Sequence, residues 1–107
     1  MKDILYGPAL AKDRNLLALA QQRSEQLEDV VGSFAPSVTA EWDRALDAGA
    51  HPLVTLRLSD WSGSVTAVME PKELESDKQM RGRFNFLWAD LLGVRSQKHL
   101  ERLLASD

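Results

Sequence analysis

The chain has 107 residues, a net charge of −3 at neutral pH and no cysteine. Its length fits a single domain over residues 1–107, and its 44% of hydrophobic residues are enough for one core. The lack of cysteine excludes disulfides, thiolate metal sites and thiol nucleophiles. Because no apolar run is long enough to cross a bilayer or to act as a leader, we expect a cytoplasmic location and no membrane partner.

The first predicted element is one long helix over residues 8–31. Pro8 suits the first turn of a helix, where its missing N–H would have no partner, and no further glycine or proline follows until Gly32. Apolar residues recur at steps of three, four and seven, with Asp13 and Ser24 as polar interruptions. This pattern predicts a helix that covers a core.

A second, shorter helix is predicted over residues 38–48. Ser37 can cap its start and Gly49 can end it. Val38 and Trp42 share one side of this helix with two later apolar residues, and the other side is charged. We therefore expect Trp42 to lie in the core.

Residues 52–69 change to a period of two, which predicts a β-hairpin around the polar turn 60–63. Pairing Leu58 with Val65 would place the alternate apolar side chains on one face and Arg57 on the other. A type I turn with a glycine bulge also suits this turn, but it would shift the pairing by one residue. We favour the register that keeps one face apolar.

The last third predicts two helices joined at Gly93. Ser76 and Gln79 form a capping-box pattern, and the apolar residues of 80–92 give the clearest helical periodicity in the chain. Gly93 would end this helix, and Ser96 would cap the next one.

Together these elements predict an α+β fold with two N-terminal helices, a central antiparallel β-hairpin and two C-terminal helices. A hairpin alone is marginally stable, so its apolar face needs cover. The helix over residues 80–92 is the simplest cover. The alternative is that hairpin edges pair between two chains, which would give a homodimer with a four-stranded sheet.

The chain lacks the spacings that usually carry chemistry. His51 and His99 are the only histidines, and they lie in no metal-ligand spacing. No nucleophile-elbow or phosphate-loop motif occurs, and the paired carboxylates lie on polar helix faces. We therefore expect no enzymatic activity and no cofactor.

Trp61 is the leading candidate for a binding residue, because a large aromatic at the tip of a polar turn cannot easily fold onto its own hairpin. Tryptophan is a frequent anchor of protein interfaces, and Arg57 on the adjoining strand could extend such a patch. Alternatively, Trp61 packs over a neighbouring helix and completes the core. The sequence thus favours a small protein-interaction domain that binds itself or acts as an adaptor, accessory subunit or inhibitor of a larger protein.

A nucleic-acid-binding regulator is the alternative function. Residues 78–102 carry a charge of +4, and residues 87–104 resemble a helix-turn-helix, with Ala89 four residues before Gly93 and a polar, basic segment after it. An ordinary pair of helices gives the same pattern, the same charges also suit solvated faces, and the chain as a whole is acidic. The side chains that would contact nucleic acid are Arg81, Arg83, Arg95, Gln97, Lys98 and Arg102.

Overall fold

A computed structural model describes residues 1–46 and 49–105 and shows an α+β fold. The elements in chain order are β1 (Asp3–Tyr6), α1 (Pro8–Ala11), α2 (Arg14–Val31), the 3-10 helix η1 (Gly32–Ser37), β2 (Thr39–Leu46), β3 (Pro52–Asp60), β4 (Gly63–Met69), the 3-10 helix η2 (Pro71–Glu75) and α3 (Asp77–Ala105).

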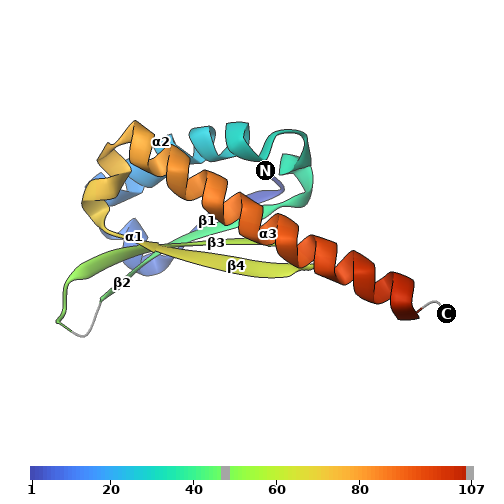
Figure 1. Cartoon of the computed structure of the whole chain (residues 1–107). Helices are drawn as coiled ribbons and strands as arrows, with labels where there is room; N and C mark the ends of the chain where they lie inside the picture. The colour runs from blue at the N-terminus through green and yellow to red at the C-terminus, as the bar shows by residue number, and fades with distance from the viewer. Residues whose placement is uncertain (47–48, 106–107) are drawn as a thin grey trace.

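The four strands form one mixed sheet in the order β1-β2-β3-β4. β1 is parallel to β2, with α1 and α2 in the connection between them, and the other two pairs are antiparallel. Figure 1 shows α2 and α3 on the same side of the sheet, with α3 crossing it obliquely. The layers are therefore one sheet and one layer of helices.

The core lies between these two layers. Trp42, Leu56 and Leu58 point from the sheet into it and are completely or almost completely buried. Phe84 of α3 meets the Trp42 ring edge-on, with 6.1 Å between the ring centroids. The predictions that Trp42 lies in the core and that this helix covers the hairpin are confirmed.

The hairpin register is the predicted one. Leu58 pairs with Val65, and Arg57 pairs with Thr66 on the opposite face. The four-stranded sheet, however, forms within one chain, because β2 and β1 extend the hairpin beyond β3. A second copy is therefore not needed to complete a sheet of this size.

Arg23 fixes the position at which α3 begins. Its guanidinium is largely buried, and Nε donates to the carbonyl oxygen of Leu74 at 2.7 Å. Nη1 lies 3.0 Å from a carboxylate oxygen of Asp77, the first residue of α3. A charge-assisted contact of this kind holds α2 against the start of α3.

The predicted helix over residues 8–31 is two helices. Asp13 lies between them, where its side chain accepts a hydrogen bond from the backbone N–H of Leu16 at 3.1 Å. This is the usual role of aspartate at the start of a helix. Asp13, one of the two residues that interrupt the apolar pattern, is thus the N-cap of α2.

The helix predicted over residues 38–48 is wrong, because residues 39–46 form β2; residues 47–48 lie outside the part that the structure describes. Val38, Ala40 and Trp42 are buried, which is a period of two, and eight residue pairs join β2 to β3. Pairing with β3 outweighs the local helical pattern.

The predicted break at Gly93 is also wrong. α3 is one continuous helix of 29 residues, so the helix pair and the helix-turn-helix are absent. Its start is as expected, since the backbone N–H of Gln79 donates to Ser76 Oγ at 3.2 Å. Glycine within a helix costs only about 1 kcal/mol relative to alanine. Val94, the next residue, packs against the hairpin at Gly63.

Candidate interaction surface

The C-terminal third of α3 extends past the body of the molecule (Figure 1). The buried residues of α3 are Met80, Phe84, Leu87, Trp88 and Leu91, and no later residue in its described range is buried. The helix therefore covers the core with its first half and offers much of its second half to solvent. None of the described helices is long and apolar enough to span a membrane.

Trp61 connects the hairpin turn to this second half of α3. Its side chain is 45% exposed, and its ring meets the His99 ring edge-on with 5.0 Å between centroids. The Arg102 guanidinium lies 4.4 Å from the Trp61 ring centroid, which is within cation–π distance. Trp61 thus packs over a neighbouring helix while keeping nearly half of its surface exposed.

Arg95 lies beside Trp61 and faces a buried carboxylate. Its guanidinium is 4.8 Å from the Phe34 ring centroid and 5.9 Å from that of Trp61. Its Nε lies 3.9 Å from Oδ2 of Asp60, whose side chain has no exposed surface. The other Asp60 oxygen accepts from the backbone N–H of Ser62 at 2.8 Å and so shapes the turn. Arg95 therefore acts within the chain as the counter-ion of Asp60.

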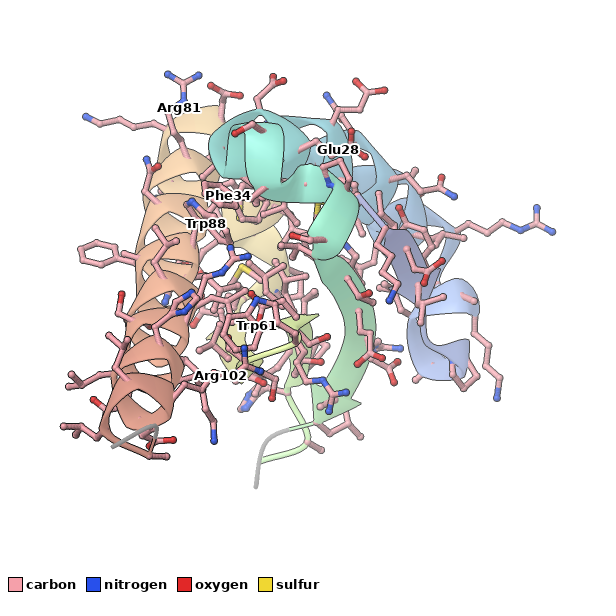
Figure 2. All side chains as sticks on the ribbon, turned by 90° about the vertical axis from the view of Figure 1, so that its right-hand side faces the viewer. Glu28, Phe34, Trp61, Arg81, Trp88 and Arg102 are labelled. Atoms are coloured by element: carbon pink, nitrogen blue, oxygen red, sulfur yellow. The ribbon has the colours of Figure 1, made fainter. Side chains whose placement is uncertain are left out.

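These contacts form one continuous cluster between the hairpin and α3. The rings of Phe34 and Trp88 continue it toward the core, with 5.7 Å between their centroids. Figure 2 shows Phe34, Trp88, Trp61 and Arg102 following one another beside α3. We call this set the Trp61 cluster: Phe34, Trp61, Trp88, Arg95, His99 and Arg102.

The opposite side of α3 carries exposed apolar residues. Phe86, Leu100 and Leu103 are 76%, 49% and 69% exposed. They belong to a row whose members are separated alternately by four and three residues, and small residues fill the remaining places. We call this row the outer stripe of α3: Gly82, Phe86, Ala89, Gly93, Ser96, Leu100 and Leu103.

Neither glycine of the outer stripe is needed for packing within the chain. A Cβ placed on Gly82 or Gly93 would have no atom within 4 Å. Glycine is a poor helix former, and both residues lie well inside α3. Gly7 is a contrasting case, since a Cβ there would overlap the Asp43 carboxylate.

The basic residues predicted to contact nucleic acid do not form one surface. Figure 2 shows Arg81 and Arg102 at opposite ends of α3. Two pairs of an arginine and a carboxylate, Arg81–Asp77 and Arg83–Glu73, lie near the start of the helix with N–O distances of 3.0 and 2.9 Å. Lys98 pairs with Glu101 at 3.4 Å, Arg95 and Arg102 belong to the Trp61 cluster, and Gln97 is exposed.

Glu73 lies in η2, just before α3, and its carboxyl contacts Arg83 of α3. Partial burial alone would raise the pKa of its carboxyl. Hydrogen bonds from the Arg83 guanidinium and the Glu70 backbone N–H, together with the charge of Arg83, outweigh this effect and lower the pKa below its ordinary value of 4.5. Arg83 therefore forms an ion pair within the chain, which joins α3 to η2.

Arg57 lies apart from the Trp61 cluster. It projects from the face of the sheet opposite the core and pairs with Glu41 at 2.9 Å. Trp61 instead turns toward α3. Arg57 and Trp61 were predicted to form one patch, but the contacts of the described residues do not join them.

The hollows in the described surface are open to solvent. One of about 510 Å³ lies beside Trp61, lined by Lys2, Pro36, Ser37, Thr39, Ser59 and Asp60. Within the described residues, no three His, Asp or Glu side chains lie close enough to hold a metal ion.

The outer stripe was missing from the sequence-based prediction although its spacing is visible in the sequence. The four–three alternation runs from Gly82 to Leu103, but a helix end predicted at Gly93 cuts it in two. Once α3 is continuous, the stripe becomes one line.

No protein-family model, no curated protein and no solved structure matches the chain.

Proposed function

We propose that this chain is a protein-interaction domain that binds another polypeptide through the outer stripe of α3. The observation that supports this most is the line of exposed Phe86, Leu100 and Leu103 on a helix that reaches beyond the sheet. Exposed apolar side chains that share one helix face are a feature of protein interfaces. An exposed apolar helix face is a common recognition element, and Phe86, Leu100 and Leu103 share one face of α3.

The Trp61 cluster has a supporting role in this proposal. His99 and Arg102 contact Trp61 on the side of α3 that faces the hairpin. These contacts hold the second half of α3 in a fixed direction before a partner arrives. Such pre-organisation lowers the entropy lost on binding. The exposed part of Trp61 also leaves an aromatic surface beside the helix.

A polypeptide partner fits this surface better than nucleic acid. The outer stripe contains no basic residue. Arg81 and Arg83 already lie beside carboxylates, so phosphate would have to displace Asp77 and Glu73 from them. Affinity for nucleic acid depends mainly on free basic groups facing phosphates.

The proposal can be tested by photo-crosslinking in living cells. A photoreactive phenylalanine analogue is placed at Leu104, which is exposed and adjoins the outer stripe, and in a control variant at Gln22 on the exposed side of α2. We expect a discrete crosslinked protein product from position 104 and none from position 22.

A second change keeps this test specific to the stripe. With the photoreactive group still at position 104, Leu103→Asp should remove the product, because the aspartate would be desolvated in the interface. No product from position 104, or equal products from both positions, would contradict the proposal.

A further inference from the structure

We infer that the partner of the outer stripe is a second copy of this chain, with the two α3 helices antiparallel and crossing at Gly93. The inference rests on the proposed function, because it names the partner of the same surface. It comes from the order of side-chain sizes along the stripe and from the charges beside it.

The spacing of the stripe is the spacing of paired helices. Residues separated alternately by four and three stay on one face of a helix that wraps around a partner at a shallow angle of about 20°. The stripe runs through three heptads, from Gly82 to Leu103, on the side of α3 away from the sheet. It is therefore long enough for a continuous helix–helix contact.

Side-chain sizes along the stripe match when the second copy runs in the opposite direction. Gly93 then lies opposite Gly93 of the other copy, and Phe86 lies opposite Leu100. Toward one end, the large Leu103 lies opposite Gly82, which has no side chain. The arrangement is self-complementary, as a twofold axis through Gly93 requires.

The charges beside the stripe favour the same direction. Arg83 directly follows Gly82 and Glu101 directly follows Leu100, so both flank the stripe on one side. In an antiparallel pair, Arg83 of each copy lies beside Glu101 of the other. In a parallel pair the two residues would be at opposite ends. Arg83 is 45% exposed beside Glu73 and Glu101 is 52% exposed beside Lys98, so each side chain keeps surface that can face the other copy without breaking its pair within the chain.

The glycines explain how the two helices come close. The positions where a Cβ would stand on Gly82 and Gly93 are open, and Gly93 is at the crossing point. Small residues at a crossing let two backbones approach to the short end of the usual 8–10 Å range. Glycines that weaken the isolated helix therefore have a use in the pair.

The first experiment measures the molar mass of the full chain by sedimentation equilibrium across the micromolar range. We expect the mass to rise from 11.9 kDa toward twice that value. Gly93→Leu should weaken the dimer by at least about tenfold, because the leucine fills the crossing point. Gln22→Leu adds the same side chain on α2 and should leave the dimer unchanged.

The second experiment tests the direction of the helices. The chain has no cysteine, so introduced thiols report only on the designed positions. In the antiparallel pair, the double variant Gly82→Cys/Leu103→Cys should form intermolecular disulfides on oxidation, and Leu103→Cys alone should not.

A monomeric mass at every concentration, a dimer that Gly93→Leu does not weaken, or efficient disulfide formation by Leu103→Cys alone would overturn the inference. A monomeric mass together with a photo-crosslink from Leu104 to a different protein would reject the second copy as the partner. That combination would leave the proposed function standing, so the two failures are distinguishable.

Discussion

Ser24 shows how one polar residue organises the core of this protein. Its hydroxyl donates to the carbonyl oxygen of Ala20 at 2.8 Å and accepts from the indole N–H of Trp42 at 3.0 Å. The Tyr6 hydroxyl lies 3.1 Å from the same oxygen. One side chain on α2 thus satisfies polar groups from β1 and β2, on the side of the sheet where α3 also packs.

We expect Ser24→Ala to lower the free energy of unfolding by about 1–3 kcal/mol, because the buried Trp42 N–H would lose its acceptor. Chemical denaturation followed by tryptophan fluorescence measures this change. Ser37→Ala, which removes an exposed hydroxyl that bonds only within its own turn, is the control. Equal effects of the two substitutions would contradict this role of Ser24.

Glu73 predicts a pH dependence of stability. Its pKa is lowered in the folded protein, chiefly by Arg83 and by the Glu70 N–H against an opposing effect of burial. The charged form therefore favours folding at pH values above its unfolded pKa. This contribution is lost as the pH falls through the lower folded pKa.

Glu73→Gln should accordingly reduce stability at neutral pH and make little difference in acid, because glutamine keeps an acceptor for the Glu70 N–H but loses the charge that faces Arg83. Thermal unfolding of both proteins from neutral to acidic pH measures the difference. Glu75→Gln removes a charge from the same 3-10 helix and serves as the control. A Glu73→Gln effect independent of pH would be inconsistent with this assignment.

At the scale of elements, the glycines of this chain differ in what they contribute. Gly82 has ordinary helical geometry and open space at its Cβ position. Gly32, which ends α2, also has open space, but its φ of +65° is one that other residues rarely adopt. A Cβ would therefore have space at both positions, but only Gly32 has a backbone conformation that disfavours other residues.

Gly82→Ala should stabilise the monomer by up to about 1 kcal/mol, whereas Gly32→Ala should destabilise it by a similar amount. Denaturation at low protein concentration measures both changes without a contribution from association. If Gly82→Ala were the destabilising substitution, α3 would need a close contact at this glycine that the described residues do not show.

The elements that could be predicted are those whose local pattern and final environment agree. The hairpin alternates strictly, so its register followed from keeping one face apolar. β2 could not be predicted in this way, because Trp42 fits both a period of two and a helical period. Residues 39–46 form a strand because they pair with the edge of β3, and this edge exists only in the folded sheet.

The candidate site could also be predicted only in part from the sequence. Trp61 could be identified as a residue without room on its own hairpin, and it does pack half-exposed against a helix. Its neighbour Arg102 was predicted to belong to a separate helix, and Arg95 to the connection before that helix, because Gly93 resembles a helix end. Whether a glycine ends a helix depends on what the following residues contact, and here Val94 and Arg95 contact the hairpin.

At the scale of the whole molecule, the two sides of the long helix lie in different surroundings. Its inner side packs on β3 and β4, and its Arg102 contacts Trp61 of the hairpin turn, which fixes the direction of the helix. Its outer side keeps Phe86, Leu100 and Leu103 in solvent. In the antiparallel pair that we infer, a second α3 would cover these three side chains.

Amide hydrogen exchange of the full chain at low and high protein concentration reports on this surface without any substitution. If the outer stripe pairs with a second copy, protection of amides between Gly82 and Leu103 should rise with concentration, since fraying of α3 is suppressed in the pair. Amides of β2 and β3 that exchange by local opening, away from the stripe, should exchange at the same rate at both concentrations. Exchange in α3 that is independent of concentration, with the sheet as an internal reference, would contradict association through this helix.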